Sequence, residues 1–155
     1  MYSNGLAEDA VTARLRSACP HWRSLYGLSD DDAFDLIQND QIDILVDLSG
    51  HTMGNRLTLF AQRPAPWQVS YLGYPATTGL RQMDYRLTDE WADPVGQTEA
   101  FHSEKLMRLA GGFLCYQPPA NAPDVAPRPE RENGYLTFGS CSNLAKVTPA
   151  VIAVW

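Results

Sequence analysis

The sequence predicts an α/β fold with a parallel sheet. Helical and extended patterns alternate along the chain, and the central residues of the segment 42–48 (IDILVDL) are nearly all apolar, as in a strand covered on both faces. The chain has 155 residues, of which 45% are hydrophobic, so a folded domain with a core is expected rather than a disordered chain. This length is too short for two complete α/β domains.

Two helices are expected in the first third of the chain. Residues 6–18 carry apolar residues at helical spacing and predict a surface helix that stops before Pro20. Ser29, followed by three aspartates, predicts the N-cap of a second helix, because its hydroxyl can accept a free amide while carboxylates favour the positive helix end. The aspartates could instead form a metal site, although such runs are usually solvated caps. Four residues of this helix are expected to point inward: Ala33, Phe34, Leu36 and Ile37.

Short strands and turns are expected in the middle of the chain. The amphipathic segment 55–62 is followed by Arg63-Pro64-Ala65-Pro66, which forbids helix continuation. Further strands are predicted at residues 67–72, 83–88 and 106–109, with a short helical turn between residues 97 and 105.

A proline-rich stretch separates the last part of the chain. Five prolines between Pro118 and Pro129 argue against a helix or central strand and predict an extended connector. Residues 134–139 then predict a strand, and Thr148-Pro149 predicts an N-cap followed by a helix. We therefore divide the chain into the later part of one α/β domain (1–117), a connector (118–133) and the start of a second domain (134–155). Since no strand precedes the first helix and the last helix stops short, both ends are expected to lie inside larger domains.

Charge and composition argue against several classes of protein. Twelve basic and eighteen acidic residues give a net charge of −6, the wrong sign for gathering nucleic-acid phosphates. No apolar run could span a bilayer and no secretory signal opens the chain, so a cytoplasmic protein without a membrane partner is expected. Three cysteines, which form no metal or redox motif, are expected to be reduced packing residues: Cys19, Cys115 and Cys141.

Candidate site residues follow two of the predicted strands. His51 comes directly after residues 42–48, at the carboxyl end where open α/β sheets bind ligands; a hydrogen-bonding surface residue is the alternative. The loop 73–79 (GYPATTG) combines glycines, a proline and two hydroxyls, which suits it to approach a ligand, although a structural turn has the same composition. Asp43 and Asp47 share one face of a strand and could form an acid–base pair, but bonds to nearby backbone amides are the commoner role.

One more candidate lies near the C-terminus. Lys146 precedes the Thr148-Pro149 helix start, so its ammonium and the helix amides could bind one anion such as a pyrophosphate; a solvated lysine is the alternative. The sequence contains no P-loop, dinucleotide-binding, zinc-protease or α/β-hydrolase motif.

Several blocks of sequence together resemble the catalytic region of the protein O-linked N-acetylglucosamine transferases, in their bacterial and plant form. The blocks are IDILVDLSGHT, LFAQRPAPWQVSYLGYPATTGLRQMDYRLTD, HSEKLMRL with FLCY, and YLTFGSCSNLAKVTPAVIAVW, in the order found in the family. The resemblance extends from about Ile42 onward and covers residues 6–39 less specifically. It implies a Rossmann-like fold of the two-domain GT-B type, in which donor and acceptor meet in a cleft between the domains.

The resemblance also implies roles for individual residues. Asn143 and Lys146 match positions that contact the uridine diphosphate of the donor. The family's proposed catalytic histidine lies before the start of this chain, so no catalytic residue is expected here. His51 matches a histidine in bacterial and plant members and a tyrosine in animal members, and the loop departs from the family's GYPGTSG at Ala76 and Thr78. Five residues are expected to line the active-site cleft: His51, Tyr74, Pro75, Thr77 and Thr78.

The implied reaction transfers N-acetylglucosamine from a UDP-sugar to serine or threonine hydroxyls of proteins. No metal or cofactor is expected, because a lysine and helix amides can meet the charge of the leaving pyrophosphate. Family members often carry tetratricopeptide repeats, and this region alone is expected to be inactive. Two alternatives stay open: a related transferase that moves a hexose to protein asparagine, and a non-catalytic α/β binding module with degenerate sites.

Overall fold

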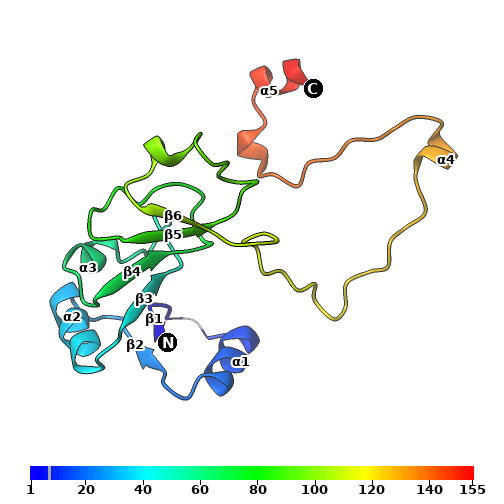
Figure 1. Ribbon diagram of the computed structural model, residues 1–155. Helices are drawn as coiled ribbons and strands as arrows, with labels where there is room; N and C mark the ends of the chain where they lie inside the picture. Colours follow the sequence, from blue (N-terminus) through cyan, green and yellow to red (C-terminus); the bar gives the residue numbers. More distant parts are fainter. Residues whose placement is uncertain (7) are drawn as a thin grey trace. The chain divides into compact units, whose positions relative to one another are not determined.

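The computed structural model describes residues 1–6 and 8–155 (Figure 1). The chain divides into two compact units, Met1–Cys115 and Tyr116–Trp155, and each is described by itself. None of the described helices has the length and apolar character needed to cross a bilayer.

A four-stranded parallel sheet organises the first unit (Figure 1). Its strands follow the chain order, each paired in parallel with the next: β3 (Ile44–Asp47), β4 (Trp67–Ser70), β5 (Tyr85–Thr88) and β6 (Lys105–Arg108). A second, two-stranded parallel sheet joins β1 (Tyr2–Ser3) to β2 (Arg23–Ser24). The predicted α/β fold with a parallel sheet is confirmed, whereas β1 and β2 were missed because two residues carry no periodic pattern.

The helices of this unit use the caps that their sequences favour. Helix α1 (Ala10–Ala18) begins after Asp9, whose carboxylate accepts the amide of Thr12 at 2.8 Å. It buries none of its residues, as predicted for a surface helix, but it starts at Ala10 instead of Leu6, and Ala7 lies outside the described residues. Helix α2 (Asp30–Asn39) is capped as predicted by Ser29, whose hydroxyl accepts the amide of Asp32 at 3.1 Å.

The three aspartates of α2 make separate contacts. Asp32 accepts the Ser29 hydroxyl at 2.6 Å, Asp30 pairs with Arg56 at 3.3 Å, and Asp31 accepts the Gln62 amide at 3.0 Å. The structure therefore gives these carboxylates capping and surface roles, and the described residues contain no cluster of metal-binding side chains.

The core lies between α2, α3 (Leu57–Ala61) and one face of the larger sheet. Ala33 and Ile37 of α2 are fully buried, and Phe34 and Leu36 pack against the core, which confirms the predicted inward face. Full burial of one large aliphatic or aromatic side chain contributes roughly 1.5–3 kcal/mol. The remaining core residues come from the segments around the sheet: Leu25, Leu45, Leu57, Leu59, Phe60, Ala65 and Met83.

Most of the opposite face of the sheet is left uncovered by the described residues of the first unit, although Val69 of β4, which lies on this face, is only 8% exposed. Along β3, Leu45 is buried whereas Ile44 and Val46 are 58% and 43% exposed. Strand register places Trp67 and Met107 on this second face, and they are 50% and 44% exposed. The prediction that residues 42–48 are covered on both faces is therefore wrong, because the helices of the first unit that contribute to the core, α2 and α3, pack on the Leu45 side.

The second unit contains short helical segments and no strand among its described residues. These segments are α4 (Glu130–Asn133), the 3-10 turn η2 (Leu144–Lys146) and α5 (Pro149–Val154). The predicted strand at 134–139 is wrong, because this unit offers no second strand to complete a hydrogen-bonded ladder. The cap at Thr148 is confirmed: its hydroxyl accepts the amide of Val151 at 3.4 Å.

The cysteines are free thiols, as expected, but only Cys19 is partly buried. Cys115 and Cys141 are exposed, so a packing role is wrong for both. Each lies on an irregular segment that few side chains surround.

Candidate active site

The loops that follow β3 and β4 meet at the carboxyl edge of the sheet. Because these neighbouring strands are parallel, their last residues, Asp47 and Ser70, lie side by side. The imidazole of His51 meets the ring of Tyr74 edge to face, with ring centroids 5.2 Å apart. Its Nε2 lies 2.8 Å from the carbonyl oxygen of Thr78. The structure thus brings His51 together with the 73–79 loop, which also carries the other four predicted cleft residues. Their lining of an active-site cleft stays a prediction.

Two glycines make this close approach possible. Gly50 has a φ of 52°, and a Cβ placed there would lie 2.2 Å from the Cβ of Tyr74. A Cβ on Gly73 would lie 1.7 Å from the carbonyl oxygen of Leu48. Any larger residue at either position would push the two loops apart.

Asp47 holds the backbone that leads to His51. Its Oδ1 accepts the amide of Ser49 at 3.0 Å, and its Oδ2 accepts the amide of Gly50 at 2.8 Å. The preferred interpretation of Asp47 as an acceptor of backbone amides is confirmed. Asp43 is exposed and makes no pair with it among the described residues.

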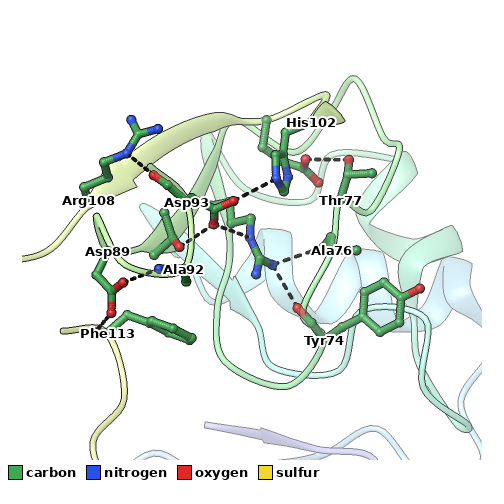
Figure 2. A network of polar contacts seen from close by, with 12 residues as sticks. Tyr74, Ala76, Thr77, Asp89, Ala92, Asp93, His102, Arg108 and Phe113 are labelled. Atoms are coloured by element: carbon green, nitrogen blue, oxygen red, sulfur yellow. Dashed lines mark hydrogen bonds and ion pairs between the residues drawn. The ribbon is translucent and has the colours of Figure 1, made fainter. Parts of the chain in front are cut away.

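Two buried charged side chains hold the 73–79 loop. Arg86 of β5 donates from Nη1 to the carbonyl oxygens of Tyr74 at 2.8 Å and of Ala76 at 3.1 Å (Figure 2). Glu104, directly before β6, accepts the Thr77 hydroxyl at 2.7 Å, the Thr78 amide at 2.6 Å and the Thr78 hydroxyl. Burial raises the pKa of Glu104, but the hydrogen bonds from Thr78 and Thr77 outweigh it, so the pKa lies below its ordinary value.

An ion-pair network continues from Arg86 into the interior. Its Nε lies 3.8 Å from Oδ2 of Asp93, and Oδ1 of Asp93 lies 3.2 Å from Nε2 of His102 (Figure 2). Thr88 donates its hydroxyl to the same carboxylate. Burial raises the pKa of Asp93, but the hydrogen bond from Thr88 and the neighbouring guanidinium of Arg86 hold it below its ordinary value.

The roles of Arg86, Asp93 and Glu104 were not predicted from the sequence. One signal was available, since a charged residue inside the predicted strand 83–88 has to find a partner if that strand is buried. Its partners, however, lie on loops that only the fold brings close.

The two predicted donor contacts lie together in the second unit. The side-chain oxygen of Asn143 accepts the amide of Ala145 at 3.0 Å and so caps η2. Lys146 is the last residue of that turn and is exposed. No ion pair joins Lys146 to another residue in the described parts of the chain. Their assignment as contacts of the uridine diphosphate stays a prediction.

Comparison with known proteins finds long matches. Residues 8–117 match the model named "Glycosyl transferase family 41". Two relatives named "Probable UDP-N-acetylglucosamine--peptide N-acetylglucosaminyltransferase SPINDLY", from Petunia hybrida and Arabidopsis thaliana, are each 46% identical to this chain over 159 residues. These alignments cover 100% of this chain and 17% of each relative.

Two further matches come from a plant and a bacterium. A relative named SEC, from Arabidopsis thaliana, is 35% identical over 92% of this chain and 15% of its own length. The solved structure of a mutant O-GlcNAc transferase from Thermobaculum terrenum matches with a TM-score of 0.77 and 44% identity. This match covers 81% of the present chain and 24% of the bacterial one. The chain thus spans 17% of the length of the SPINDLY relatives it matches.

Proposed function

Because the chain belongs to glycosyl transferase family 41, we propose that it is a region of a transferase that moves N-acetylglucosamine from a UDP-sugar to protein serine or threonine hydroxyls. The observation that carries this proposal is the meeting of His51 with the 73–79 loop at the carboxyl edge of a parallel sheet. This edge is where α/β sheets bind their ligands.

The geometry divides the predicted cleft residues into two groups. The hydroxyls of Thr77 and Thr78 are both bonded to Glu104, so we assign them to holding the loop rather than to a ligand. His51 and Pro75 are exposed and Tyr74 is partly buried, and we assign these three side chains to the cleft surface.

The transfer needs a neutral acceptor hydroxyl near the anomeric carbon, and positive charge near the leaving diphosphate. We assign the positive charge to the ammonium of Lys146, with Asn143 as a polar contact of the donor. On this assignment neither a metal nor a cofactor is required, because a fixed cation can stabilise the leaving group. We also propose that the protein is cytoplasmic, as its sequence led us to expect, and that the full-length polypeptide carries the tetratricopeptide repeats that the resemblance implies.

Binding of UDP to the full-length protein tests the function. We expect Lys146→Ala to weaken UDP binding by about tenfold or more, because a hydrogen bond between charged groups contributes roughly 1.5–3 kcal/mol. Lys105→Ala is the matched control, since Lys105 is exposed on β6 and lies over the Tyr85 ring at 5.9 Å. If the two variants bind UDP with equal affinity, Lys146 is not part of the donor site. If the wild-type protein binds no uridine nucleotide, the proposed transferase function is wrong.

A further inference from the structure

We propose that Glu104 is a positioning residue for His51. It holds Thr78 so that the Thr78 carbonyl keeps the imidazole proton on Nε2, which leaves Nδ1 free to accept a hydrogen bond or a proton. The assignment of Nδ1 to a transferase cleft rests on the proposed function, whereas the tautomer is a property of this chain alone.

The contact of the His51 imidazole with a carbonyl oxygen fixes its tautomer. A carbonyl oxygen can only accept, so the 2.8 Å contact between His51 Nε2 and the Thr78 oxygen requires the proton on Nε2. In a neutral imidazole Nδ1 then carries the lone pair. No hydrogen bond from the described residues reaches Nδ1, and His51 is exposed, so a ligand can approach it.

Glu104 holds Thr78, the residue that supplies this carbonyl. Thr78 is 3% exposed, and Oε1 of Glu104 accepts both its amide, at 2.6 Å, and its hydroxyl. Oε2 of the same carboxylate accepts the hydroxyl of Thr77 at 2.7 Å. One buried carboxylate therefore fixes the backbone on the amino side of Thr78 while the carbonyl on its other side meets His51.

The surroundings of residue 104 suit a glutamate. All three groups that face Glu104 are donors, and only a carboxylate accepts on both of its oxygens. A glutamine would place its own NH₂ where one carboxylate oxygen now accepts, so at least one of the present bonds would be lost or its hydroxyl would have to turn and accept. The substitution Glu104→Gln therefore keeps the size of the side chain and removes part of the restraint on Thr78.

The test reads the tautomer of His51 directly, by ¹H–¹⁵N correlation spectra of the imidazole nitrogens at a pH where the ring is neutral. His51→Gln identifies the signal among the three histidines. We expect a single Nε2–H tautomer in the wild type. In Glu104→Gln we expect a second tautomer with a population of about one tenth or more.

Matched variants separate positioning from general damage. Glu99→Gln is the control, since Glu99 accepts from Arg108 at 2.6 Å and has no bond to the loop. Thr78→Val replaces the hydroxyl that Glu104 accepts with a methyl group and should also release the tautomer, whereas Thr78→Ser keeps a hydroxyl and should keep the single tautomer. If Glu104→Gln does not fold, the valine and serine variants decide the question.

Two results would overturn the inference: an Nδ1–H tautomer in the wild type, or an unchanged single tautomer in folded Glu104→Gln and Thr78→Val. Neither measurement requires a nucleotide. A single Nε2–H tautomer in a protein that ignores UDP would therefore remove the proposed function and leave the role of Glu104 standing.

Discussion

Replacing Arg86 with methionine tests whether the buried cation, rather than the shape of its side chain, supports the 73–79 loop. The variant keeps most of the aliphatic length but loses both hydrogen bonds to loop carbonyls and the ion pair with Asp93. The side chains of Arg86 and Asp93 are only 4% and 8% exposed, so Asp93 would keep a buried charge with less compensation. Breaking such a pair costs about 3–5 kcal/mol.

The assay is urea unfolding, with Arg23→Met as the control. Arg23 pairs with Asp40 at 2.7 Å, but its side chain is 52% exposed and solvent screens the pair, so we expect a much smaller loss of stability there. The double variant Arg86→Met with Asp93→Asn should lose less unfolding free energy than the two single variants lose together, because both substitutions remove the same interaction. Equal losses in Arg86→Met and Arg23→Met would refute the reasoning, as would additive losses in the double variant.

Two other predictions concern Gly50 and Glu99. Gly50→Ala should lower the thermal unfolding midpoint more than Gly27→Ala. Both glycines have positive φ, but a Cβ on Gly27 meets nothing within 4 Å, whereas one on Gly50 would collide with Tyr74. Equal losses in the two variants would contradict the close approach of Gly50 and Tyr74. The pKa of Glu99 is lowered to about 2, first by the hydrogen bond from the Gly96 amide, so its contribution to stability is present above its ordinary pKa of 4.5 and is lost as pH falls toward about 2. Urea unfolding of wild type and Glu99→Gln should therefore differ above this window and converge below it; a constant difference would contradict the shift.

Local patterns were sufficient for much of the fold. The caps at Ser29 and Thr148 were predictable because the capping hydroxyl and the amide that it accepts lie three residues apart. The strands β3 to β6 were located correctly because short segments with β-branched, aromatic or other apolar residues lie between prolines, glycines and polar turns, although β5 and β6 also contain charged residues.

The errors arose where the outcome depends on distant partners. The apolar run at 42–48 shows that a buried strand is favoured, but only the surrounding segments decide whether one face or both are covered. Residues 134–139 have the composition of a strand and no second strand to pair with in their unit.

The candidate site was predictable in its position but not in its support. His51 and the 73–79 loop could be found because each follows a predicted strand. The bonds that organise them join residues 26 to 27 positions apart in the case of Thr78 with Glu104 and with His51. No pattern within a short window of sequence contains such pairs.

The outer edge of the four-stranded sheet has a consequence for how this chain behaves in solution. Strand β3 is the outermost of its sheet, so one side of its backbone has no strand partner among the described residues. Residues 42–48 contain no lysine or proline, and Asp47 is buried and bonded to backbone amides, so Asp43 is the one exposed charge there that discourages a foreign strand from adding. At the concentrations used for spectroscopy, molecules should therefore self-associate edge to edge, and solubilising additives or dilution become part of handling this polypeptide in isolation.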